Sequence, residues 1–200
     1  MIGIFSLSAF AFAEIKDFGF TNIHTARIAA SDNDDSLYLS RAAFTIDYEL
    51  TPIERTFNIL PFFEYQHNID SEDWWRREAG AEIGTSFFND IFYYGASFQH
   101  VWQQEENYPV ELLEETTEWE SRFVITPPLN WWLFEDVLTL HLFDEYTYDF
   151  TRGQATFNTC GATIDWNIND WLTVPFGWKH IDRVHDFDAD TFEFSLQLNF

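Results

Sequence analysis

The chain has 200 residues and a formal net charge of -24, with only 10 lysines and arginines. Because attraction to phosphate requires basic side chains, this charge argues against nucleic acid as a partner. The aromatic content of 20% excludes a disordered chain, which would be poor in such residues. The length fits one domain, and no apolar run approaches the roughly 18 residues of a transmembrane helix. Cys160 is the only cysteine, so no intrachain disulfide forms.

The N-terminal segment, residues 1–13, is apolar and ends in Ala11-Phe12-Ala13. Small residues at these alternating positions are typical of the cleavage site of a secretory signal peptide. We therefore predict a signal peptide over residues 1–13 and a β-barrel domain over residues 14–200. No basic residue precedes Lys16, so the usual basic start of a signal peptide is missing. The alternatives are a start further upstream or an ordinary apolar strand.

From Phe18 onward, runs in which every second residue is apolar alternate with short polar breaks, and no helical period competes. Side chains of a β-strand alternate between two faces, so this pattern predicts strands, about ten in all. Pro61 lies inside the third strand and predicts a bulge or local break there, because proline has no N–H to donate. The predicted spans are 18–30, 37–50, 55–66, 78–87, 91–103, 118–126, 138–143, 154–168, 172–179 and 190–200.

In these strands one face is apolar and bulky, and the other is polar. From the fourth strand to the last, the apolar face has no charged residue within the predicted spans. Contact with lipid produces such a separation, because a charge at mid-bilayer costs about 2–4 kcal/mol for Arg or Lys. The apolar, lipid-facing side includes Phe44, Ile46, Phe98, Leu138, Leu140, Phe176, Phe194 and Leu196. The charged residues predicted on the opposite side are Arg41, Asp47, Glu49, Glu64, Glu78, Glu82, Glu120, Arg122, Asp165, Lys179 and Glu193.

The last predicted strand has the clearest alternation and ends on an aromatic residue, with Phe192, Phe194, Leu196, Leu198 and Phe200 on one face. This pattern resembles the closing strand of bacterial outer-membrane β-barrel proteins, a broad class within which no narrower family is matched. The resemblance implies an all-β, up-and-down antiparallel transmembrane barrel of about ten strands, with eight to twelve allowed. It also implies a location in the bacterial outer membrane, contact with membrane lipid, and recognition of these five residues by the barrel-assembly machinery.

The same alternation has a second interpretation, a soluble lipocalin-like barrel or β-sandwich whose apolar face turns inward. Connection lengths give the orientation of a membrane barrel, since periplasmic turns are short and outer loops are long. Short turns at Thr51, Asn89 and Asn167 therefore predict the periplasmic end. The outer loops, which are longer and acidic as a group, are predicted over residues 31–36, 68–77, 104–117, 149–153 and 182–189. The aromatic residues predicted to form a girdle near the periplasmic rim are Phe87, Phe88, Trp131, Trp132, Trp171 and Phe200.

The polar face predicts a small lumen lined by acidic residues. Rings of carboxylates attract cations, which favours a small porin-like protein with small cations as solutes. The alternative is a structural surface protein with a closed lumen, in which Arg41, Arg122 and Lys179 cross-link the acids and side chains fill the barrel. A third hypothesis is an adhesin or receptor that acts through the outer loop 104–117, where the apolar and aromatic residues are Tyr108, Pro109, Leu112 and Leu113.

An enzyme is the minority hypothesis. Pairing Trp102 with Trp119 would place His100 opposite Ser121, with Asp144 diagonal to Ser121. This set resembles outer-membrane phospholipases and lipid A deacylases, although the local His-x-Ser pattern of those families is missing. No cofactor is expected. The alternating acids Asp186, Asp188 and Asp190 predict at most a weak site for hard cations, with solvated loop charge as the alternative.

Overall fold

The computed structural model describes residues 13–30, 36–50, 55–69, 75–104, 114–128, 137–184 and 188–200. None of these residues belongs to a helix that is long and apolar enough to span a membrane. The predicted signal peptide lies outside the described residues, except for Ala13. Ten strands are described: β1 (Ala13–Ala29), β2 (Leu37–Leu50), β3 (Arg55–Asn68), β4 (Trp75–Phe87), β5 (Phe92–Gln104), β6 (Glu114–Ile125), β7 (Leu138–Asp149), β8 (Gln154–Asn169), β9 (Leu172–Arg183) and β10 (Ala189–Asn199).

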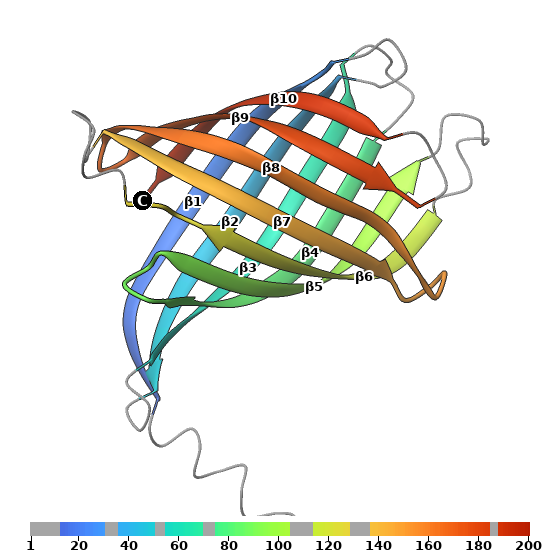
Figure 1. The fold of residues 1–200 in the computed structure, drawn as a ribbon. Coiled ribbons are helices and arrows are strands. Elements are labelled where there is room, and N and C mark those ends of the chain that lie inside the picture. The colour runs from blue at the N-terminus through green and yellow to red at the C-terminus, as the bar shows by residue number, and fades with distance from the viewer. Residues whose placement is uncertain are drawn as a thin grey trace, which may run out of the picture.

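The strands form one closed barrel in which each strand pairs antiparallel with its neighbours in the sequence, and β1 pairs with β10 (Figure 1). At the seam Phe20 and Phe200 exchange two backbone hydrogen bonds of 2.9 and 2.8 Å. Closure leaves no unpaired strand edge, which a bilayer would not tolerate. The predicted all-β, up-and-down antiparallel barrel is therefore confirmed.

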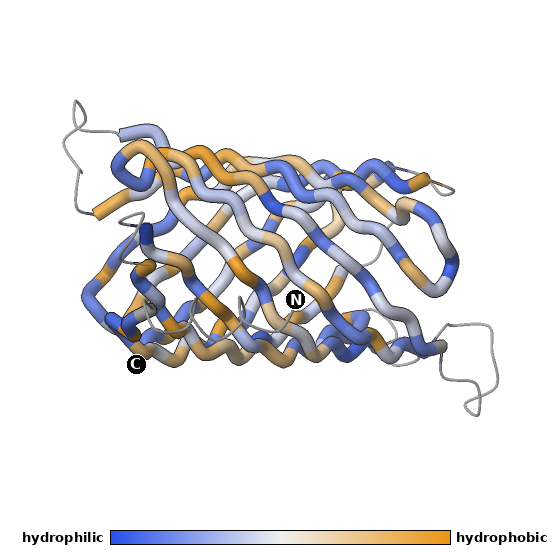
Figure 2. The backbone as a smooth tube through the Cα atoms, turned by 90° about the horizontal axis from the view of Figure 1, so that it is seen from below, coloured by the Kyte–Doolittle hydropathy of each residue, from blue (hydrophilic) through white to orange (hydrophobic). Residues whose placement is uncertain are grey.

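The apolar face of each strand points outward and the polar face points inward. Phe98 and Phe194 each keep 59% of their surface exposed, whereas Glu64 and Glu82 keep 7%. Along the strands hydrophobic and hydrophilic residues alternate (Figure 2). The soluble alternative, with the apolar face turned inward, is therefore wrong. Exposed Phe44, Phe176 and Leu196 also lie on the outer face, and Ile46, Leu138 and Leu140 share its parity.

Pro61 interrupts one ladder without shifting the register. The pairs Ala43–Phe62 and Ile46–Ile59 flank a gap between β2 and β3, while Pro61 still lies opposite Ala81 on β4. The local break predicted from the missing N–H is present, and the alternative of a bulge is not.

Several strands extend beyond their predicted spans at the end of the barrel away from Phe200. β4 begins at Trp75, β6 begins at Glu114, and β7 and β9 continue to Asp149 and Arg183. Alternation marks only the part of a strand that has lipid on one side and polar surroundings on the other. Beyond that part the backbone ladder continues while polar residues such as Arg77 and Asp182 also occupy outward positions, so the pattern ends before the strand does.

Two connections show how the strands turn. Between β4 and β5, Phe88, Asn89 and Asp90 have φ values of 54°, 56° and 63°, a left-handed conformation that Asn and Asp tolerate better than most residues. Between β7 and β8, Asp149 accepts backbone hydrogen bonds from Thr151 and Arg152 at 2.7 and 3.0 Å. The connection predicted over residues 149–153 is therefore present, but it is a tight turn rather than a long loop, because Asp149 ends β7 and its carboxylate caps the turn.

Candidate functional site in the lumen

The polar faces of the strands enclose a central cavity of about 300 Å³. Its wall includes side chains from β1 to β9, so the site is built by the barrel as a whole. The predicted inward-facing residues that line it are Arg41, Glu64, Glu78, Glu120, Arg122 and Lys179. Arg27, Arg76 and Glu145 line it as well.

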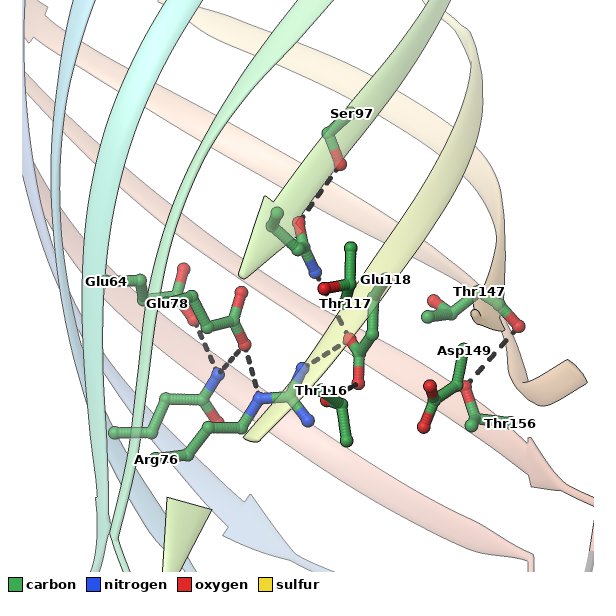
Figure 3. A network of polar contacts seen from close by, with 12 residues as sticks. Glu64, Arg76, Glu78, Ser97, Thr116, Thr117, Glu118, Thr147, Asp149 and Thr156 are labelled. Carbon is green, nitrogen blue, oxygen red and sulfur yellow. Dashed lines mark hydrogen bonds and ion pairs between the residues drawn. The ribbon is translucent and has the colours of Figure 1, made fainter. Parts of the chain in front are cut away.

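Arg76 on β4 connects two neighbouring parts of this wall. Its guanidinium forms ion pairs with Glu78 on the same strand and, at 2.7 Å, with Glu118 on β6 (Figure 3). The amide of Gln66 donates to Glu64 at 2.6 Å and to Glu78 at 3.4 Å. Two carboxylates that lie opposite each other, Glu64 and Glu78, are thus held by one amide and one guanidinium. This arrangement offsets their mutual repulsion.

A second group of ion pairs lies across the barrel from Arg76, at the seam. Glu193 on β10 accepts a hydrogen bond from Arg27 on β1 at 2.7 Å and lies 3.1 Å from the ammonium of Lys179 on β9. The ion pairs Arg122–Glu145, at 3.2 Å, and Arg41–Glu64, at 3.6 Å, link two further pairs of strands, β6 with β7 and β2 with β3. We call these ion pairs, together with those of Arg76, the lumen network.

Aromatic rings fill much of the remaining interior. The guanidinium of Arg41 lies 3.9 Å from the centroid of Phe62. Arg122 and Lys179 lie 5.6 and 5.4 Å from that of Phe143. Tyr93 donates a hydrogen bond to Glu82 and lies over Gly84, where even a Cβ atom would collide with its ring. These rings therefore occupy part of the lumen beside the charged groups.

Further cavities lie toward the two ends. The cavity near the β4–β5 turn has about 570 Å³ and is lined by Asp47, which accepts a hydrogen bond from Asn58 at 2.7 Å. The other has about 280 Å³, contains Asp149 in its lining, and shares Arg76 with the central cavity. Phe157 and Arg183 also line both of these cavities. Of the other predicted charges, Glu49 pairs with Lys16 at 3.1 Å, and Asp165 lies 3.2 Å from His141.

Sequence reasoning missed the lumen-network members Arg27, Arg76 and Glu118. Arg76 shares the parity of Glu78 and needed only a longer fourth strand to be placed inside. Arg27 lies on β1, where neither face of the sequence is cleanly apolar. The parity of the side chains would have placed Arg76 inside. The inward position of Arg27 follows only from the ladder between β1 and β10, in which Arg27 lies opposite Glu193.

The constellation predicted for an enzyme is not assembled. His100 lies opposite Thr117, and Ser121 lies opposite Ala96, so the real register differs from the predicted one by four residues. Because four is even, the shift leaves each side chain on its predicted face, and alternation could not detect it. Asp144 does lie diagonal to Ser121, since it neighbours Tyr146, the partner of Ser121 on β7. We do not propose a hydrolase.

The weak cation site is only partly within the described residues, because Asp186 lies outside them. Asp190 accepts a hydrogen bond from the indole of Trp178 at 3.0 Å and lies 3.2 Å from His180. Among the described residues, no three His, Cys, Asp or Glu side chains are grouped as metal ligands would be. Trp131 and Trp132 also lie outside the described residues, so the periplasmic aromatic girdle stays a prediction. The loop residues predicted for an adhesin, including Tyr108, lie outside them as well.

No protein-family profile matches the chain, and no curated protein matches it. It resembles the translocator domain of the autotransporter NalP from Neisseria meningitidis, with 8% identity over 92% of this chain and 88% of that chain, and a TM-score of 0.48. For the KdgM porin the identity is 9%, the coverage 91% and 99%, and the TM-score 0.45. For the NanC porin the identity is 6%, the coverage is 90% of this chain and 98% of that chain, and the TM-score is 0.45.

The geometry of the chain itself decides its class. Every strand is paired on both sides in a closed ladder, the outer face is apolar, and charged groups are gathered inside. This is the architecture with which outer-membrane proteins satisfy their backbone and cross a bilayer. The chain therefore has the fold of an outer-membrane β-barrel, as its last strand predicted.

Proposed function

We propose that the protein is a small porin-like channel that conducts water and small ions and excludes bulky solutes. The observation that carries this proposal is the position of Arg76, which borders both the central and the outer cavity. The two polar cavities thus share part of their lining, and a side chain with two ion pairs lies in that shared part. Water and ions pass such a constriction when the side chain moves, whereas a larger solute meets fixed backbone.

The charges of the inner face favour cations over anions. Carboxylates outnumber basic residues in the cavity near the β4–β5 turn, where Asp47 and Asp90 lie with Arg55, whereas three arginines accompany Glu118 and Asp149 in the cavity at the other end. An acidic opening at the end of a channel raises the local concentration of cations and repels anions. In the centre, by contrast, basic residues match the acids in ion pairs, which lowers the selectivity there. We therefore expect a small conductance with a moderate preference for cations.

Planar-bilayer recordings of the refolded chain test this function. Wild type should show small, cation-preferring steps, and Arg76→Ala should enlarge them several-fold because it removes the group between two cavities. Glu115→Ala is the matched control, since Glu115 lies on the outer face of β6 and should leave conductance unchanged. Absence of steps from both wild type and Arg76→Ala would overturn the channel and favour a structural surface protein with a closed lumen.

A further inference from the structure

Charges on the outer face are distributed unequally around the outer end of the barrel, the end away from Phe200. On β6, β9 and β10 the outward residues near this end include Glu115, Asp182 and Asp190. On β3 and β4 they include His67 and Arg77. In a chain with a net charge of -24, an exposed arginine among aromatic rings is a marked local exception.

The guanidinium of Arg77 lies against two aromatic side chains. Its guanidinium lies 4.5 Å from the ring centroid of Trp75 and 5.8 Å from that of Tyr65, which is its partner on β3. Stacking on aromatic faces orients a guanidinium while leaving the N–H groups at its edge able to donate. Arg77 therefore presents a fixed, exposed cationic fork on the outer wall.

The rings continue from Arg77 toward β1. His67 lies next to Tyr65 on the same face, with ring centroids 5.6 Å apart, and 5.1 Å from Tyr38 on β2. The hydroxyl of Tyr38 lies 2.6 Å from Nδ1 of His24. Nδ1 of His67 is buried and has no hydrogen-bond partner among the described residues. We call His24, Tyr38, Tyr65, His67 and Arg77 the outer basic strip.

The strip lies at the boundary of the lipid-facing surface. Outward positions of β4 run from Phe87 through Ile83 and Ala79 to Arg77, so apolar residues lie directly below the guanidinium. Tyrosine and tryptophan concentrate at such interfaces, where one end of the ring is apolar and the other is wet. A lipid whose chains cover Ile83 and Ala79 would bring its head group to Arg77.

We propose that the outer basic strip binds the phosphate group of an outer-leaflet lipid. The planar fork of Arg77 matches two phosphate oxygens, and Tyr38 and His67 supply further polar groups on the same face. The site faces lipid rather than the lumen, so the proposal is independent of the channel function. Its charge is also opposite to that of the acidic residues elsewhere on the rim, which would repel the same head group.

Native mass spectrometry of the full chain in detergent tests the site, with phosphatidic acid as the probe. Arg77→Gln should weaken binding of this lipid about tenfold, because one charge-assisted bidentate contact is lost. Arg77→Lys, which keeps the charge and loses the fork, should lie between. Phosphatidylcholine with the same acyl chains, which has no net charge, should bind weakly and equally to all variants.

Arg55→Gln is the matched control. Arg55 also stacks on a ring, 4.6 Å from the centroid of Phe87, but it lies at the other end of the barrel and donates to the carbonyl of Ser86. It should change phosphatidic acid binding less than about twofold. Equal losses in Arg55→Gln and Arg77→Gln, or no loss in either, would overturn the proposal. Displacement of the lipid by millimolar inorganic phosphate would show a free-anion site instead and would equally overturn it.

Discussion

Two neighbouring arginines on β4 have opposite surroundings. Arg76 points into the lumen and pairs with Glu78 and Glu118, whereas Arg77 points outward and stacks on Trp75 and Tyr65. Inside the barrel a charge lies in a narrow space between protein walls, where an opposite charge offsets the loss of hydration. On the outer wall it needs only to reach the interface while its stem lies on apolar surface. One step along a strand therefore changes the kind of partner that a guanidinium requires.

The largest expected loss of stability comes from removing a charge on the inner face. Glu193→Gln leaves both Arg27 and Lys179 without their carboxylate, and we expect the free energy of unfolding to fall by about 3 kcal/mol. Urea unfolding in lipid vesicles, followed by tryptophan fluorescence, measures it. Glu115→Gln, on the outer face with 59% of its side chain exposed, should change stability by less than about 0.5 kcal/mol. Equal effects of the two substitutions would contradict the contrast.

On the outer face a charge should be costly only where lipid surrounds it. Phe194 is 59% exposed in the middle of β10, and Phe194→Arg should lower the unfolding free energy in vesicles by about 2–4 kcal/mol. Val184→Arg places the same charge just beyond the end of β9, where the expected loss is about 0–1 kcal/mol. If both variants lost the same stability, the outer face would not be covered by a bilayer.

The smallest effect concerns Asp144, an acid on the outer face of β7. Asp144 is exposed, lies between Phe123 and Cys160 on neighbouring strands, and accepts a hydrogen bond from Asn158 at 3.1 Å. Asp144→Leu should stabilise the barrel in vesicles by about 1 kcal/mol, since an acid facing lipid costs less than Arg or Lys. Asp182→Leu, near the outer end of β9, should bring no such gain. A loss on replacing Asp144 would indicate that its carboxylate has a partner in the membrane.

Alternation predicted which face of each strand meets lipid, because bilayer and lumen select side chains with period two. The inward positions of Glu64, Glu78 and Lys179 followed from it. Register did not follow, since His100 and Ser121 can slide by an even number of residues without changing faces. The partners within the lumen network, such as Arg27 with Glu193, depend on register and on closure of the seam. Contacts across the barrel were therefore beyond the reach of sequence.

The pair Arg27–Glu193 joins the first and the last strand, and its two residues are 166 positions apart in the sequence. Of all the strand pairings in the barrel, this one has the highest entropic cost of loop closure, because its two strands are the most distant in the sequence. We therefore expect this contact to form late in folding. A charge attraction at that point acts over a longer range than van der Waals contact. It would draw the first and last strands together before their backbones meet, and strong salt should slow that final step.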